Sequence, residues 1–188
     1  MKKLFLTLIV AFFTITGGIA QNVTVEEPEF AEETLLLTSD NQGVKLSREN
    51  GTVKTKAGAS LYLTGIGKVK SRLTLKGVKS TSKAVGGSTT RLIVKAADNK
   101  TDPNSFISIF KFEVKGKERR YLLAEAGTLS KSESNNLSSV DYKAKKYGES
   151  SYYIVLEDLT PGEYGIVIGD PNHENTKNGM KVTTFTVE

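Results

Sequence analysis

Residues 68–76 read KVKSRLTLK, a strict alternation of basic or hydroxyl side chains with apolar or small ones. A period of two places the two sets on opposite faces of an extended chain, so this segment predicts a β-strand with one buried and one solvated face. The basic side chains Lys68, Lys70, Arg72 and Lys76 are then expected to share the solvated face.

The same period recurs along the chain from about Leu35 onward. Further strands are predicted at residues 91–96, 152–157, 164–168 and 180–187, which are rich in apolar and β-branched side chains. Ser105 to Val114 is apolar on both faces and is therefore expected to be the most buried strand, in the middle of a sheet. Residues 140–147 lack the wide apolar stripe of an amphipathic helix, which favours a short strand.

Turn signals separate these segments. Lys115-Gly116-Lys117 and Asn50-Gly51 are predicted hairpin turns, since glycine readily adopts the positive φ that such turns require. About eight to ten strands without helices predict an all-β fold. We expect an antiparallel two-sheet sandwich, immunoglobulin-like or jelly-roll-like, with a small closed β-barrel as the alternative.

The first twenty residues have the pattern of an export signal. Lys2 and Lys3 precede an apolar run at 4–15, and small residues follow at Gly18-Ile19-Ala20. A membrane helix needs about 20 apolar residues, so the run is too short to span a bilayer. We therefore expect an exported protein, periplasmic or on the cell surface of a Gram-negative bacterium, with no membrane span after signal cleavage.

Three segments follow from these patterns. Residues 1–20 are the predicted signal peptide, and residues 34–188 the predicted single β-sandwich domain. Between them, residues 21–33 carry five glutamates and no clear period, which indicates an acidic N-terminal arm that is mobile or loosely docked.

The composition restricts the chemistry. The absence of cysteine excludes disulfides, thiolate metal sites and cysteine nucleophiles. His173 is the only histidine and lies among turn-forming residues, which favours an exposed loop position. The alternative is a cell-wall or polysaccharide hydrolase that uses His173 with Asp170 and Glu174. The oxygen-rich stretch Asp98–Asp102 is explained by turn chemistry, so we predict no metal site, no cofactor and no enzyme activity.

The basic strand is the candidate binding site, with Lys68, Lys70, Arg72 and Lys76 as its residues. An envelope protein or an anionic glycan, including lipopolysaccharide phosphate, is the expected partner; nucleic acid is not, because no aromatic platform shares the face. The alternative is an ordinary solvated face, or lysines that protect an edge strand. The polar stretches 127–139 and 169–179 are further candidate binding loops.

Several turn and core motifs carry a resemblance. They are KYGESSYYI at 146–154, LTPGEYGI at 159–166, LKGVKS at 75–80 and DPNSF at 102–106. With its short lysine-containing signal, the chain resembles a family of uncharacterised secreted β-sandwich proteins of Bacteroidetes-type bacteria. The resemblance implies a fold and a compartment, and it transfers no functional residue. The sequence thus predicts an exported, non-enzymatic binding or structural module of the bacterial envelope.

Overall fold

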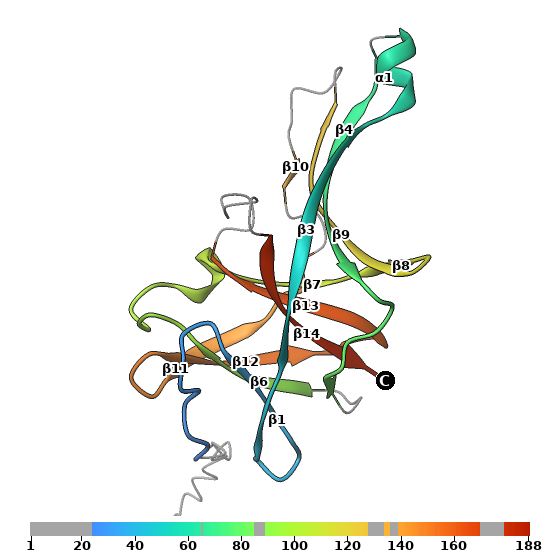
Figure 1. Cartoon of the computed structure of the whole chain (residues 1–188). Helices are drawn as coiled ribbons and strands as arrows, with labels where there is room; N and C mark the ends of the chain where they lie inside the picture. The colour runs from blue at the N-terminus through green and yellow to red at the C-terminus, as the bar shows by residue number, and fades with distance from the viewer. Residues whose placement is uncertain (1–23, 65, 85–88, 128–133, 136–138, 170–178) are drawn as a thin grey trace, which may run out of the picture.

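The computed structural model describes residues 24–64, 66–84, 89–127, 134–135, 139–169 and 179–188. The predicted signal peptide lies outside these residues, as do His173, Asp170 and Glu174 and most of the two candidate loops. The described chain folds into two packed antiparallel sheets, which confirms the predicted all-β sandwich (Figure 1).

The smaller sheet has five strands in the order β11-β12-β6-β1-β2. Its strands are β1 (Thr34–Leu37), β2 (Gly43–Lys45), β6 (Thr89–Lys95), β11 (Lys143–Tyr147) and β12 (Ser151–Glu157). The strand β11 confirms that residues 140–147 contribute a strand rather than a helix.

The larger sheet has nine strands. Seven follow the order β10-β9-β4-β3-β14-β13-β7, while β5 pairs with β14 and β8 with β9. They are β3 (Ser47–Ala57), β4 (Lys68–Lys76), β5 (Lys83–Ala84), β7 (Ile107–Lys111), β8 (Glu113–Lys115), β9 (Glu118–Gly127), β10 (Ser134–Asn135), β13 (Gly162–Ile168) and β14 (Met180–Val187). Within the described residues its end strands, β7 and β10, do not pair, so this sheet is open rather than a closed barrel.

Three hydrophobic clusters fill the molecule. The largest lies between the two sheets and includes Leu92, Ile154 and Phe185. A second lies on the other face of β13 and β14, where β4 and β9 contribute Leu73 and Leu123. A third covers the outer face of the five-stranded sheet around Ile93. Several strands are therefore buried on both faces, which is why their sequences are nearly continuously apolar.

The predicted long strand 105–114 is the main error of the sequence analysis. A 3₁₀ turn occupies Pro103–Ser105, and the strand is divided into β7 and β8. The strand β7 ends the order of the larger sheet instead of lying in its middle, and Val114 is exposed. The turn at Gly116, which has a φ of 63°, is confirmed.

The predicted turn at Asn50-Gly51 is also wrong. The strand β3 continues through both residues, pairing with β14 up to Gly51 and with β4 from Thr52. Glycine is required there for space, because a Cβ on Gly51 would lie 2.4 Å from Cδ1 of Leu73. The absence of helices was likewise predicted incorrectly, since a six-residue helix, α1 (Ala59–Thr64), joins β3 to β4.

The acidic N-terminal segment is attached at several points within residues 24–33. The carboxylate of Glu27 accepts hydrogen bonds from the backbone amides of Glu149 and Ser150, both at 3.1 Å. Glu33 pairs with Lys45, and the Tyr147 hydroxyl donates to the Val25 carbonyl. These contacts revise the expectation of loose docking for this part of the arm.

One part of the larger sheet extends away from the packed layers. The upper halves of β3 and β4 rise above the sandwich and end at α1 (Figure 1). We call residues 52–64 and 66–74 the projecting hairpin. Thr55 and Ser71 bond to each other on one of its faces, and both remain outside the buried core.

Candidate functional site: a basic face on the projecting hairpin

Three neighbouring strands bring basic side chains to one face of the projecting hairpin. In the register of β3 and β4, Lys54 is opposite Arg72 and Lys56 is opposite Lys70. The strand β9 adds Arg120 on the far side of β4, opposite Thr74. Directly paired residues of antiparallel strands project to the same side. We call this set the basic face: Lys54, Lys56, Lys68, Lys70, Arg72 and Arg120.

A β-bulge places a carboxylate on this face. Between β4 and β9 the register shifts, so that Arg72 is opposite Leu122 while Ser71 is opposite Ala124. Leu123 is the extra residue, and its side chain is buried in the second core cluster. Beyond the bulge Glu125 is opposite Lys70 and joins the face of Arg120, which simple alternation would have placed on the opposite side.

Glu125 neutralises part of the basic face. It pairs with Lys68 and, at 2.5 Å, with Lys70. Hydrogen bonds from the amino groups of these two lysines lower the pKa of Glu125 to about 2, against a weaker opposing effect of burial. The carboxylate therefore stays charged at neutral pH.

Glu118 plays the same part at the lower end of the face. It accepts from Lys54 at 3.1 Å and from Arg120 at 2.9 Å. These hydrogen bonds, from Lys54 first and then from Arg120, lower the pKa of Glu118. Glu113 of β8, opposite Arg120, also projects to this side, so the six cations meet three carboxylates, which still leaves an excess of positive charge.

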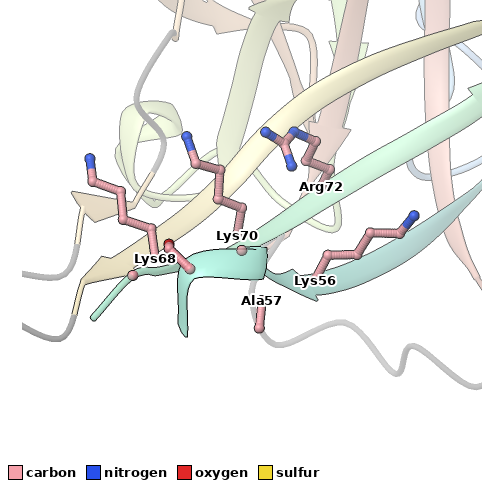
Figure 2. Close-up of a pocket in the computed structure, with 8 residues that line it drawn as sticks. Lys56, Ala57, Lys68, Lys70 and Arg72 are labelled. Carbon is pink, nitrogen blue, oxygen red and sulfur yellow. The ribbon is translucent and has the colours of Figure 1, made fainter. Parts of the chain in front are cut away.

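Lys56 and Arg72 make no ion pair with the described residues, and they line the two hollows of this surface. The upper hollow, of about 350 Å³, lies between the hairpin strands beneath α1 and is also lined by Lys68, Lys70 and Ser60. Figure 2 shows Lys68, Lys70 and Arg72 extending to the same side of the ribbon.

A lower hollow, of about 90 Å³, continues the same surface. Lys56 and Arg72 line it as well, together with Glu118 and Arg120. An ammonium group offers three donors, and a guanidinium offers a planar fork that fits the oxygens of phosphate, sulfate or carboxylate. The surface is therefore equipped to hold an extended anion.

The structure brings together three of the four residues predicted from the sequence. Lys68, Lys70 and Arg72 line the upper hollow of the basic face. Lys76 projects to the same side of β4 but lies at its other end, exposed and opposite Glu118, where it lines neither hollow. The sequence analysis missed Lys54, Lys56 and Arg120. The alternation of KTK at 54–56 indicates a strand with both lysines on one face. The turn wrongly predicted at Asn50-Gly51 hid the fact that these lysines belong to the long strand β3.

The other sites considered in the sequence analysis have ordinary structural explanations or few charged groups. Asp98 and Asp102 each accept a backbone amide two residues on, as turn residues do. No group of three metal-binding side chains occurs in the part of the chain that the structure describes. A separate hollow of about 240 Å³ near Ala96 and Phe106 is lined by Asp98 as its one charged residue.

No protein-family model matches the chain, and no curated protein matches it. Among the described residues, no helix has both the length and the apolar composition that crossing a bilayer requires. The functional argument therefore rests on the geometry of the basic face.

Proposed function

We propose that this protein is an exported, non-enzymatic binding module of the bacterial envelope that holds an anionic glycan or a similar polyanion on its basic face. Residues Lys56 and Arg72 are the central contacts, and Lys54, Lys68, Lys70 and Arg120 surround them. Export to the periplasm or to the cell surface is part of the proposal and rests on the sequence pattern of residues 1–20.

The observation that carries the proposal is the pairing of like charges across β3 and β4. Lys54 faces Arg72 and Lys56 faces Lys70 in two successive cross-strand pairs on one side of the sheet. Like charges directly opposite each other destabilise a sheet. Glu118 and Glu125 neutralise Lys54 and Lys70 in these pairs, so the repulsion that remains is centred on Lys56 and Arg72. An anion bound over the strands would relieve it.

Protection of an edge strand does not account for this pattern. The strand β4 has β3 on one side and β9 on the other along the basic segment, so its backbone groups are already paired. Lysines that prevent edge-to-edge association are needed only where a strand lacks a neighbour. Protection of an edge therefore does not explain the presence of Lys68, Lys70 and Arg72.

The shape of the surface favours a polymer over a single small anion. The upper and lower hollows are neighbours that share Lys56 and Arg72 as lining residues, and both are bounded by further cations. A ligand with anionic groups along its length can contact several of these side chains at once. Such binding is weakened by salt, since exposed charges are screened beyond about 10 Å at 0.1 M ionic strength.

The test compares the purified protein with its Lys56→Ala/Arg72→Ala variant on immobilised heparin, a sulfated glycan, and on unsubstituted dextran. We expect the wild type to bind heparin in a salt-dependent way and to ignore dextran. The variant should bind heparin about tenfold more weakly or worse, because two charge-assisted contacts are lost.

The matched control is Lys100→Ala/Lys146→Ala, which removes the same charge from exposed positions away from the hairpin. It should bind heparin like the wild type. Equal losses in both variants would mean that net charge alone is responsible, and an unaffected Lys56→Ala/Arg72→Ala variant would overturn the proposed site.

A further inference from the structure

The end of the projecting hairpin exposes an apolar cluster. Tyr62 and Leu63 of α1 are 80% and 84% exposed, and Ile66 is 52% exposed. Three of the seven large apolar side chains that are exposed among the described residues thus lie within five positions of the sequence. We call Tyr62, Leu63 and Ile66 the apolar tip.

The apolar tip is held in place by contacts of its own. The Leu61 amide donates to the Gly58 carbonyl at 3.0 Å, and the Thr64 hydroxyl donates to the Ser60 carbonyl at 2.8 Å. A Cβ on Gly67 would lie 2.8 Å from the Leu61 backbone nitrogen, so the returning chain packs closely on α1. The fold of this turn therefore presents Tyr62 and Leu63 outward instead of turning them into the hairpin.

The basic face begins directly beneath the apolar tip. Lys68 follows Ile66 by two residues, and the upper hollow is lined by Ser60 and Gly67 on the side of α1 and by Lys70 and Arg72 on the other. A hydrated soluble polymer offers nothing for three exposed apolar side chains. A bilayer with anionic headgroups offers acyl chains to the apolar tip and, in the layer above them, phosphates to the cations of the basic face.

We propose that the apolar tip inserts into the interfacial layer of an anionic lipid bilayer while the basic face binds the lipid phosphates. This inference deepens the proposed function and rests on it, since it names the source of the anionic groups. Tyr62 suits the interface because its ring is apolar and its hydroxyl is polar. Insertion would be shallow, of the order of 5–10 Å, as for other segments that lie in the interface without spanning it.

The experiment measures partition of the mature chain onto vesicles of phosphatidylcholine with and without phosphatidylglycerol. We expect binding only when phosphatidylglycerol is present. Tyr62→Ser/Leu63→Ser should lower that partition about tenfold or more, because the apolar area that enters the bilayer is lost. Its retention on heparin should stay unchanged, because the basic face is intact.

A control and a direct reporter complete the test. Val78→Ser/Val114→Ser removes two exposed apolar side chains outside the tip and should leave partition unchanged. The chain has no tryptophan, so Leu63→Trp supplies a single fluorophore at the tip. Its emission maximum should shift to shorter wavelength on anionic vesicles. Addition of heparin should leave the emission wavelength unchanged.

The outcomes separate the two proposals. Loss of both heparin and vesicle binding in Lys56→Ala/Arg72→Ala, with loss of vesicle binding alone in Tyr62→Ser/Leu63→Ser, supports both. Normal vesicle binding of the tip variant, or an unshifted Trp emission, overturns the bilayer inference and leaves the polyanion site standing. Heparin binding that ignores the basic-face substitutions overturns the proposed function itself.

Discussion

Glu125 illustrates how a single carboxylate limits the charge of the basic face. It holds both Lys68 and Lys70, and only 15% of its side chain is exposed. The two lysines can reach an incoming anion only by sharing or leaving this partner. Glu125 therefore competes with the ligand, which makes it the most informative single position on the face.

We predict that Glu125→Gln strengthens the binding of polyanions. Removing the charge releases Lys68 and Lys70 and adds one positive charge to the face without changing the size of the side chain. The salt concentration that elutes the variant from heparin should rise above that of the wild type. Glu157→Gln is the control, since it removes a carboxylate paired with Lys143 on the other sheet; an elution point unchanged in Glu125→Gln would contradict the competition.

The sequence could predict the strand at 68–76 but not the position of Glu125. Alternation from Arg120 assigns residue 125 to the opposite face, and the bulge at Leu123 reverses that assignment. A bulge depends on which residues pair across strands, and a local pattern does not contain this information.

The burial of Arg119 could not be predicted either, because it also depends on contacts between distant strands. It is 1% exposed and donates to Glu49 at 2.6 Å, while Glu163 bonds to Ser80 and Thr186 nearby. These residues are far apart in the sequence. A buried guanidinium is tolerated only because tertiary pairing supplies its carboxylates.

At the scale of elements, β3 is the strand on which the projecting hairpin depends. Its lower half pairs with β14 in the body of the larger sheet, and its upper half pairs with β4 in the hairpin. Gly51 lies at the change of partner, where the buried side chain of Leu73 occupies the space of a Cβ. The close contact between Gly51 and Leu73 therefore lies where β3 leaves the body of the sheet and enters the hairpin.

We predict that Gly51→Ala destabilises the fold by about 1–3 kcal/mol, as overpacking of a core does. Urea unfolding measures the free energy. The cost should fall in a Leu73→Ala background, because the opposing methyl groups are gone, and a double-mutant cycle would reveal that coupling. Gly116→Ala serves as the comparison. A Cβ there meets nothing within 4 Å, so any cost comes from its positive φ and should not depend on Leu73.

Element type was predictable where one period governs a whole strand, as in β4, β6 and β12. The position of a strand within its sheet could not be predicted in the same way. The strand β7 is apolar on both faces and was expected in mid-sheet, yet it ends the larger sheet. Two of its carbonyls are instead satisfied by the irregular segment that precedes β11, with the Val140 amide donating to Ile109 and the Tyr142 hydroxyl to Ile107. Burial of an edge by an irregular segment has no periodic signature.

At the scale of the whole molecule, the N-terminal segment adds a covering to the five-stranded sheet. Val25 packs against the cluster around Ile93, on the face that a simple two-layer sandwich would leave to solvent. The acidic composition of this segment suggested a loose arm. Three of its glutamates, Glu27, Glu32 and Glu33, instead act as hydrogen-bond acceptors and ion-pair partners, and this depends on the fold and not on the composition.

The strongest of these attachments is Glu27. Burial acts to raise its pKa, but the nearby Ser151 side chain, the hydrogen bonds from the backbone amides of Ser150 and Glu149 and the charge of Lys95 outweigh it and lower the pKa to about 2. Gly148 makes room for the carboxylate, since a Cβ there would lie 2.3 Å from its Cδ. The charged form of Glu27 thus favours the folded state.

We predict that Glu27→Gln flattens the dependence of stability on pH. The folded pKa lies below the unfolded value of about 4.5, so the stabilisation is complete above pH 4.5 and is lost as the pH falls towards 2. Its size is at most about 3 kcal/mol, from the shift in pKa. Thermal unfolding between pH 2 and 7 should show a lower Tm for the variant at pH 7 and a convergence with the wild type near pH 2. Glu29→Gln, at an exposed neighbouring position, should keep the wild-type curve. Parallel curves for Glu27→Gln and the wild type would show that the segment does not depend on this charge.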